Sequence, residues 1–515
     1  TGATRARSPA RYALQAATAL AAVVAAGASS GSGFGCAEWT PAAVPAPWPN
    51  RSDHAQVTLR NGSVLVMGGG DYATNWTVYN DVWRSDDAGS TWAPVTLRAP
   101  WAARAYLSLT AVYDRAFGPT GERLVVVGGG HCIGPFINSF CHAFEWFADV
   151  WVSDDGGATW QEAVANKTSP FAARGGHGAV ALPAATRPQR EPRPAPSHGA
   201  SAASPSEARG AGASLRSTRL SPAAAGAPAA LRDVLIFGGV NGVAAMNDAW
   251  RSADGGFTWS RVRANGTSNG FAEETGGGER GACRLRQWAA ALPHGATSPP
   301  LLRDTALLAA SRPAAAISSI LVAGRSQTAL GGRSPPAIDQ DCSELSGAEP
   351  LPTFSFHNLL RWKGSLWAIA GASSAAYVNT VWSSSDGGAT WRLAQPSAQW
   401  GIRILPATVV IPGGGAAGGN STSLLIAGGS PQTGFSALRD VWRSDDGVTW
   451  TEVTPNATWP ARGWQMATTV PADVEAAAAL GRPATVVMTG GWTWNFPEQF
   501  SWTYYKDAWR CVAQP

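Results

Sequence analysis

Five nearly identical phrases limit the architecture of this protein more than any other feature of its sequence. They read NDVWRSDDAGSTW from residue 80, ADVWVSDDGGATW from 148, NDAWRSADGGFTW from 247, NTVWSSSDGGATW from 379 and RDVWRSDDGVTW from 439. In each phrase, two short alternating stretches flank a turn rich in Asp and Gly, which is typical of a β-hairpin. Recurrence of such a unit indicates a repeat fold.

Two apolar runs precede each phrase. The first follows an aromatic residue, two further residues and an arginine, as in WPNR from residue 48, WAAR from 101 and FAAR from 171. The second ends in glycines, as in VLVMGGG from 64 and LVVVGGG from 124. With the two halves of the phrase, these runs make four short strands in each unit. Four-stranded units in series are the pattern of a β-propeller.

The glycine pair after the second strand and the Trp of the fourth strand resemble the kelch family. The turn between the third and fourth strands resembles the Asp-box, S-x-D-x-G-x-T-W, also called the BNR repeat, which is known from sialidases and other propellers. The resemblance implies an all-β fold with four-stranded antiparallel blades, in one domain over residues 36–515. It also implies that the boxes lie away from any active site.

Counting units predicts seven blades, with six as the alternative. Intact units begin near residues 48, 99, 169, 351, 397 and 457, and a degraded unit is expected between 279 and 350. The last unit stops after its third strand, whereas CAEWTPAAV from residue 36 reads like a fourth strand. We therefore expect the N-terminal segment to complete the last blade and close the ring, which removes an exposed sheet edge.

The six cysteines allow three disulfides. A Cys36–Cys511 bond would replace the covalent turn that the last blade lacks. Cys132 and Cys141 would close a loop, which leaves Cys283 for Cys342. Zinc is the alternative, but there is no CxxC pair and His131 and His142 merely flank the loop, so we expect no metal and no cofactor.

The N-terminal segment and the glycosylation sequons indicate a secretory protein. Residues 1–35 hold a basic stretch followed by about 16 mostly alanine apolar residues, which resembles a signal peptide. An organelle-targeting segment or a membrane anchor is the alternative, and a membrane association is expected only if this segment is retained. Residues 183–230 form a low-complexity insertion in the third blade that we expect to be disordered. Seven sequons add candidate glycosylation sites at Asn50, Asn61, Asn75, Asn166, Asn265, Asn420 and Asn456.

Charge argues against a nucleic-acid partner. The formal net charge is +4, but the basic excess lies in residues 1–35 and 183–230, so the rest of the chain is net negative. We expect a monomer whose partner is a glycan or a protein.

An arginine opens the first strand of most units, at Arg51, Arg104, Arg174, Arg284, Arg403 and Arg462. The fifth of the seven expected units has Phe354 nearby instead. Cations at one level near a channel mouth would receive a carboxylate, sulfate or phosphate. The alternative is a structural role, with the arginines bonding backbone carbonyls between blades.

Loops after the glycine runs are expected at the same end and are rich in aromatic residues. Repeat packing explains 16 of the 25 tryptophans but not Trp76, Trp146, Trp492, Trp494 and Trp502 in these loops. Flat aromatic faces beside polar groups suit sugar rings. The alternative is that the long loops pack on themselves.

We therefore predict a secreted or lumenal propeller that binds a glycan or a protein loop through its arginine and aromatic end, rather than an enzyme. The first alternative is a sialidase-like or other glycan-active hydrolase on the same end. Its conceivable groups are Glu498, Tyr504, Tyr505, Asp53 and the Glu273/Glu274 pair, although no spacing singles them out. A copper oxidase is not supported, and a purely structural scaffold is the last alternative.

Overall fold

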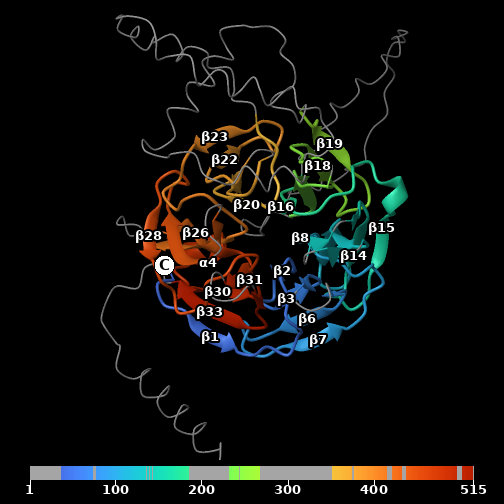
Figure 1. Ribbon diagram of the computed structural model, residues 1–515. Helices are drawn as coiled ribbons and strands as arrows, with labels where there is room; N and C mark the ends of the chain where they lie inside the picture. Colours follow the sequence, from blue (N-terminus) through green and yellow to red (C-terminus); the bar gives the residue numbers. More distant parts are fainter. Residues whose placement is uncertain are drawn as a thin grey trace, which may run out of the picture. The chain divides into compact units, whose positions relative to one another are not determined.

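The computed structural model describes residues 36–72, 77–134, 136–137, 140–141, 143–184, 231–242, 244–266, 351–373, 376–414, 420–431, 437–495 and 501–513. These residues form an all-β propeller of small antiparallel sheets, which confirms the predicted fold class. Figure 1 shows the sheets arranged around a common centre.

The described residues form six blades. From the inside outward, blade one has strands β2 Ala55–Thr58, β3 Val64–Met67, β6 Val82–Ser85 and β7 Ala93–Thr96, and blade two has β8 Ser108–Tyr113, β9 Glu122–Val127, β14 Val150–Ser153 and β15 Gln161–Val164. Blade three has β16 Gly178–Leu182, β17 Asp233–Phe237, β18 Ala249–Ser252 and β19 Ser260–Arg263, and blade four has β20 Asn358–Trp362, β21 Ser365–Ile369, β22 Val381–Ser384 and β23 Arg392–Gln395. Blade five has β25 Ala407–Gly414, β26 Asn420–Pro431, β27 Leu438–Ser444 and β28 Thr451–Thr454, and blade six has β29 Met466–Val470, β30 Ala484–Thr489, β33 Ala508–Ala513 and β1 Thr40–Ala43.

Smaller elements connect or extend these sheets. They are the short strands β4 Gly70–Asp71, β5 Thr77–Val78, β10 Gly130–Cys132, β11 Phe136–Ile137, β12 Phe140–Cys141, β13 Phe144–Trp146, β24 Arg403–Ile404, β31 Trp492–Asn495 and β32 Ser501–Tyr504, the 3-10 helix η1 Asn166–Thr168 and the helix α4 Val474–Ala479. No helix among the described residues is both long and apolar enough to cross a membrane.

The hydrophobic core lies between neighbouring sheets. Each second strand contains a largely buried apolar run, such as Val64–Met67 in β3 and the last four residues of β9. One side of it packs against the next blade, so that Leu65 and Met67 of blade one share a cluster with Leu124 and Val126 of blade two. A strand buried on both faces has to be apolar at every position, and the sequence shows this as its unbroken runs.

The junctions between blades are fixed by the glycine pair, and in blade four Ala370, with φ +59°, takes the place of the first glycine. The N–H of the second glycine donates to the carbonyl of the residue that opens the next unit, as in Gly129 to Arg174 at 2.8 Å and Gly491 to Arg51 at 3.0 Å. The first glycine has no room for a side chain. A Cβ on Gly128, whose φ is +57°, would lie 2.5 Å from the Arg174 oxygen. At Gly128, glycine is therefore required by both conformation and space.

The prediction of seven blades is wrong, and the junction between blades three and four shows why. There the Gly239 N–H donates to the Phe354 carbonyl at 2.7 Å, and Met246 bridges to Phe354. β16 also contacts β20 directly. These contacts are those of adjacent blades elsewhere, so nothing is inserted between them. The degraded unit expected at 279–350 lies outside the described residues.

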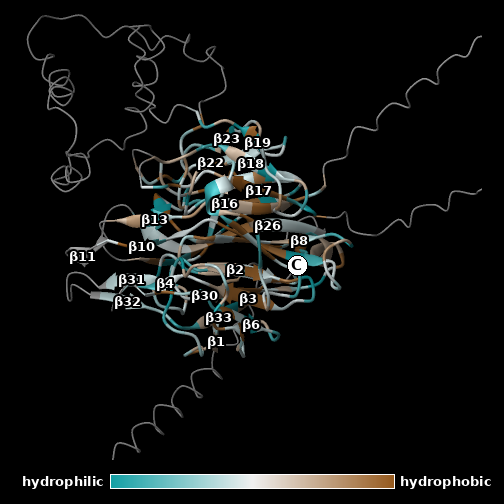
Figure 2. Ribbon diagram, turned by 90° about the vertical axis from the view of Figure 1, so that its right-hand side faces the viewer, coloured by the Kyte–Doolittle hydropathy of each residue, from teal (hydrophilic) through white to brown (hydrophobic). Residues whose placement is uncertain are grey.

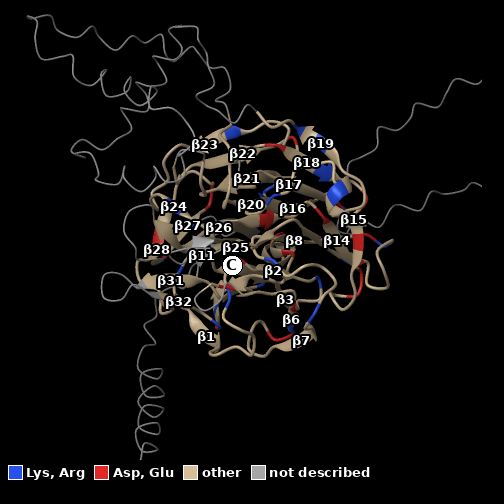
Figure 3. Ribbon diagram, turned by 45° about the vertical axis from the view of Figure 1, so that its right-hand side comes forward, with Lys and Arg blue, Asp and Glu red and all other residues tan. Residues whose placement is uncertain are grey.

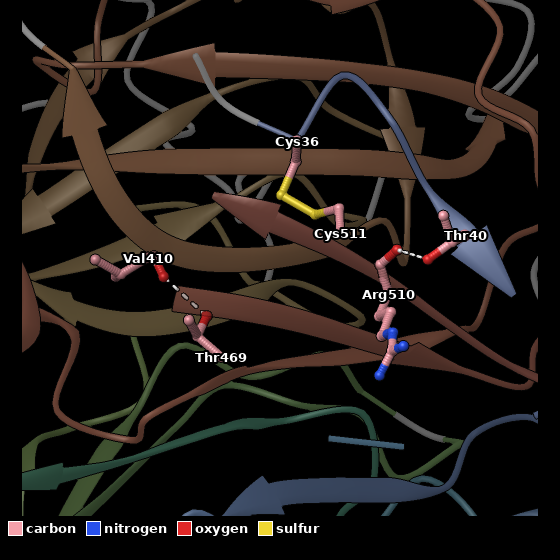
Figure 4. The surroundings of a disulfide bond; sticks show 6 residues. All are labelled: Cys36, Thr40, Val410, Thr469, Arg510 and Cys511. Carbon is pink, nitrogen blue, oxygen red and sulfur yellow. Dashed lines mark hydrogen bonds between the residues drawn. A yellow bond between two sulfur atoms is a disulfide. The ribbon is translucent and has the colours of Figure 1, made fainter. Parts of the chain in front are cut away.

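The N-terminal strand supplies the outer strand of the last sheet. β1 pairs antiparallel with β33, with Thr40 opposite Arg510, and lies beside it in Figure 1. The predicted Cys36–Cys511 disulfide is confirmed, and it joins the two segments across 475 residues of sequence (Figure 4). Trp39 meets Trp459 edge-on at 6.1 Å, as Trp160 meets Trp101 in blade two. The N-terminal segment thus takes the place of a box strand.

Candidate functional site

The Asp-box turns satisfy their own polar groups. In blade two, Asp155 accepts hydrogen bonds from the Thr159 N–H at 2.9 Å and hydroxyl at 2.5 Å, and from the Ser153 hydroxyl at 2.8 Å. Burial acts to raise the pKa of Asp155, but these hydrogen bonds outweigh it and lower the pKa. The same shift occurs at Asp87, Asp254, Asp386 and Asp446. The turn itself uses these carboxylates, which supports their structural role.

The arginines that open the first strands are buried and paired. Arg104 is fully buried, and its guanidinium donates to both carboxylate oxygens of Asp149, at 2.5 and 2.8 Å, and to the Gly128 carbonyl at 2.9 Å. Asp149 also accepts from Trp151 Nε1 at 2.9 Å. Equivalent pairs are Arg51–Asp81, Arg174–Asp248, Arg403–Asp440 and Arg462–Asp507.

These pairs remove five of the six candidate arginines from a ligand surface. Each arginine side chain is at most 3% exposed, and its guanidinium binds an aspartate of its own blade. The bonds to carbonyls expected under the structural alternative are present, but each lies within a blade. Arg284 lies outside the described residues. In Figure 3 the charged residues are scattered over the described ribbon rather than gathered in one basic region.

The sequence analysis did not identify the aspartate partners of these arginines, although one unit of the repeat indicates the pairing. The unit with Phe354 in place of the arginine also has Thr380 in place of the aspartate, in NTVW rather than NDVW. In that blade Trp382 Nε1 donates to the Thr380 hydroxyl at 3.3 Å. The joint loss of Arg and Asp in one unit out of six identifies them as partners.

Short hairpins extend the connections after the glycine runs and lie at one end of the propeller. They are β4–β5, β10–β13, β11–β12 and β31–β32, and Figure 2 shows this group on its left-hand side. The segments with the arginines pair with the bases of these hairpins, as in Ala105 with Gly130 and Gly463 with Trp492. The predicted common end for arginines and aromatic loops is therefore correct. We call it the mouth end.

The structure brings four of the five candidate tryptophans to this end. Trp146 lies on β13, Trp492 and Trp494 on β31, and Trp502 on β32. All four are half-buried, whereas the tryptophans that open the first strands, such as Trp101 at 1% exposure, are buried. Trp76 lies outside the described residues.

The mouth-end aromatic rings form two stacked groups. Trp494 stacks on Trp502 at 4.5 Å, and Trp502 meets Trp492 edge-on at 4.5 Å. In the second group, Phe144 stacks on Trp146 at 4.9 Å. The loops thus pack partly on themselves, as the alternative expected, while each of these tryptophans keeps part of its surface open to solvent.

A ring of six equivalent residues, one from each blade, surrounds the mouth. Each lies two positions after the residue that opens its unit and has φ between +47° and +60°: Asp53, Tyr106, Gly176, Phe356, Leu405 and Trp464. Backbone hydrogen bonds link them in order, for example Tyr106 N–H to Asp53 O at 2.9 Å and Gly176 N–H to Tyr106 O at 3.0 Å. The left-handed conformation is strained for Tyr, Phe, Leu and Trp, and such strain is concentrated at functional sites.

Asp53 is the acidic member of this ring. It is 7% exposed and accepts a hydrogen bond from the Ser52 hydroxyl at 2.8 Å. Burial raises the pKa of Asp53 to about 8, although Ser52 and Tyr72 oppose the shift. Proximity to Asp53 also contributes to the raised pKa of Tyr72, Tyr106 and Tyr504.

Of the groups suggested for a hydrolase, the structure brings only Asp53 and Tyr504 together. Asp53 and Tyr504 lie near each other, whereas the Tyr505 ring lies 4.0 Å from the guanidinium carbon of Arg462. Glu498 and the Glu273/Glu274 pair lie outside the described residues. The carboxylate that a nucleophilic tyrosine would require is thus not assigned.

Some of the candidate cysteines, histidines and sequon asparagines lie among the described residues. Cys132 is disulfide-bonded, while Cys283 and Cys342 lie outside the described residues, so the other two pairings stay predictions. His131 lies 3.5 Å from Glu145, and no group of three or more metal-binding side chains occurs in the described part of the chain. The sequon residues Asn61, Asn166, Asn265 and Asn456 are exposed and Asn50 is half-buried; Asn75 and the Asn420 side chain are not described.

Comparisons with known proteins assign no family to this chain. No protein-family model matches it, and no curated protein sequence does either. The repeat and the geometry of the mouth end are therefore the features from which a function can be inferred.

Proposed function

We propose that this protein is a glycan-binding propeller whose binding surface is formed by the aromatic rings of the mouth end. The observation that carries the proposal is the contrast between two classes of tryptophan. Those that open the first strands are buried, as in Trp101 and Trp459, while Trp146, Trp492, Trp494 and Trp502 are half-buried on hairpins that the repeat does not need. Exposed flat rings held by stacking suit the apolar faces of sugars.

The buried arginines change the expected ligand. Because five guanidinium groups are committed to aspartates, an acidic sugar gains no charge partner from them. The surface is better suited to neutral sugars, with ring stacking as the main attraction and hydrogen bonds from backbone and side-chain groups as the source of specificity.

The wider setting belongs to the same proposal. A buried disulfide is typical of an oxidising compartment, which supports a secreted or lumenal, glycosylated protein with a cleaved N-terminal signal. We further propose that the repeat is a kelch unit with BNR-type turns, that β1 and the Cys36–Cys511 bond close the ring of blades, and that the protein acts as a monomer.

A glycan array on the purified protein, followed by tryptophan fluorescence titration with the best ligand, tests the proposal. Trp502→Ala should weaken binding about two- to tenfold, because loss of one stacked ring costs about 0.5–1.5 kcal/mol. Trp160→Ala at the Asp-box end is the matched control, and it should lower stability without changing affinity. Absence of glycan binding, or equal losses in both variants, would contradict the proposal.

A hydrolase remains the second candidate because Asp53 and Tyr504 lie together. A panel of fluorogenic glycosides should show no turnover if the protein only binds. Turnover that survives purification and disappears in Tyr504→Phe would favour the hydrolase instead. Loss of turnover with retained glycan binding would assign Tyr504 to chemistry rather than to recognition.

A further inference from the structure

The mouth ring holds a buried carboxyl group that has no basic partner among the described residues. The adjacent cation, Arg51, donates to both oxygens of Asp81, at 2.9 and 2.7 Å, and is therefore not available to Asp53. Oδ2 of Asp53 accepts from the Ser52 hydroxyl, and the Tyr72 phenol also hydrogen-bonds the carboxyl group, but no described cation neutralises it. A buried carboxylate without a positive partner is costly, so this group requires an explanation.

Three phenols converge on this carboxyl group from three separate segments. Tyr72 follows β4, Tyr106 belongs to the mouth ring, and Tyr504 ends β32. Their rings pack together, with centroids 6.4 Å apart for Tyr72 and Tyr106 and 6.0 Å apart for Tyr72 and Tyr504. Asp71, also buried, acts on Tyr504 as a second acidic group. The local chemistry is thus aromatic and acidic.

We propose that Asp53, Tyr72, Tyr106 and Tyr504, which we call the tyrosine–aspartate site, bind a positively charged amine on a ligand. Oδ1 of Asp53 supplies the negative charge, and the phenol oxygens accept further N–H bonds. The aromatic faces attract the cation and contact its carbon substituents. This site adjoins the mouth-end tryptophans, since the ring centroids of Tyr106 and Trp146 lie 6.0 Å apart and those of Tyr504 and Trp492 lie 6.1 Å apart. It uses a different group, the Asp53 carboxylate, and does not depend on the glycan proposal.

Other ligand classes fit these groups less well. An anion would meet two carboxyl groups and no free guanidinium in the described part of the mouth. A metal ion would find fewer than three His, Cys, Asp or Glu side chains together, since no such group occurs among the described residues. An ammonium group needs only one carboxylate and a few oxygen acceptors.

Protons and the amine should compete for Asp53. Burial keeps its pKa at about 8, and a bound cation stabilises the ionised carboxylate, so affinity for the amine rises with pH and levels off above pH 8. The groups that face Asp53 do not obscure this titration. Arg51 is ion-paired, and burial and Arg51 lower the pKa of His54 to about 3. Burial raises the pKa values of Tyr72, Tyr106 and Tyr504, so these phenols keep their protons in this pH range. The negative charge of Asp71 adds to the raised pKa of Tyr504.

The test uses methylammonium and choline with the full-length protein, with binding followed by broadening of their methyl NMR signals. The neutral analogue 3,3-dimethyl-1-butanol has the shape of choline without its charge. We expect binding of at least one cation, none of the neutral analogue, and an affinity that rises about tenfold from pH 6 to pH 7 and less steeply from pH 7 to pH 8. Failure of both cations to bind at pH 8.5, or equal binding of the neutral analogue, would overturn the proposal.

Asp53→Asn is the decisive variant because Asn tolerates the left-handed backbone at this position, where φ is +54°. It should abolish cation binding and its pH dependence, while glycan binding by the tryptophan surface is retained. Glu162→Gln removes an exposed carboxylate on β15 and should leave cation affinity unchanged. Cation binding that persists in Asp53→Asn would refute the site even if glycan binding is confirmed.

Discussion

The two ends of the propeller are formed by the same repeat but use their side chains differently. At the Asp-box end, the five box aspartates make closely similar hydrogen bonds within their own turns. At the mouth end, the six equivalent ring positions carry Asp, Tyr, Gly, Phe, Leu and Trp. The buried Arg–Asp pairs form a regular layer beneath this irregular ring.

This difference separates stability from function. A residue type that recurs in every blade and finds its partners inside the blade is explained by the fold. A position that keeps its strained backbone in every blade but changes its side chain is not explained by packing alone. The mouth is therefore where substitutions should change binding, and the regular layers are where they should change stability.

The largest effect is expected when one Arg–Asp pair is broken. Arg104→Ala leaves the Asp149 carboxylate buried without its partner and should lower the free energy of unfolding by about 3–5 kcal/mol. Arg84→Ala, which removes an exposed partner of Asp86, should cost less than about 1 kcal/mol. Urea unfolding of both variants measures this, and equal losses would contradict the account.

Blade four provides a sharper version of the same experiment. In this blade, Phe354 and Thr380 stand at the positions of the Arg–Asp pair. Arg104→Phe combined with Asp149→Thr would give blade two the same two residue types at these positions. The double variant should recover part of the stability lost in Arg104→Ala, because no charge is left buried. A further loss would show that the two blades differ by more than this pair.

Removal of the Cys36–Cys511 disulfide should have the next largest effect. Cys36→Ser with Cys511→Ser should lower stability by about 2–5 kcal/mol, since the bond joins segments 475 residues apart. Thermal unfolding with and without a reductant measures the effect. The reductant should have no further effect at this site in the double variant, and an unchanged melting temperature would contradict a closing role.

A smaller, pH-dependent effect is expected for Asp53. Its folded pKa, about 8, lies above the ordinary value of 3.8, so the folded state holds its proton more tightly. The resulting stability is present below pH 4 and is lost as pH rises to 8. Asp53→Asn should therefore match the parent at pH 4 and exceed it by about 1–3 kcal/mol at pH 8 to 9. Parallel pH profiles would contradict the assignment.

The smallest effect is expected at an Asp-box. Asp155→Ala removes the acceptor for the Thr159 and Ser153 groups and should cost about 1–2 kcal/mol. Glycan and amine binding should not change, since the turn lies at the opposite end. Denaturant unfolding and a titration of the same sample check both halves of this prediction, and altered affinity would argue against separate roles for the two ends.

Several features of the fold could be predicted from the sequence because they repeat. The strand pattern, the glycine pairs and the truncated last unit lead to a propeller and to the Cys36–Cys511 bond. The number of blades could not be counted reliably, because a strand-like run such as ISSILVAG from residue 317 does not reveal whether it joins the ring. That required the contact between Gly239 and Phe354.

The candidate site was less predictable, because the role of a side chain there depends on which residues, distant in sequence, lie beside it. Six arginines at one sequence position looked like a ligand cluster, but the structure places an aspartate, from about 30 to 75 residues later in the chain, beside each of the five that it describes. The mouth ring was missed for a different reason. Its members share a backbone conformation rather than a residue type, so no residue pattern marks Asp53, Tyr106 and Trp464 as equivalent.

The central claim, that the mouth end is the functional end, can be tested most directly by hydrogen–deuterium exchange with and without the best glycan from the array. Protection should be confined to peptides covering β10–β13, β31–β32 and the mouth ring, with the Asp-box turns unchanged. Protection at the Asp-box turns with none at the mouth would contradict the account.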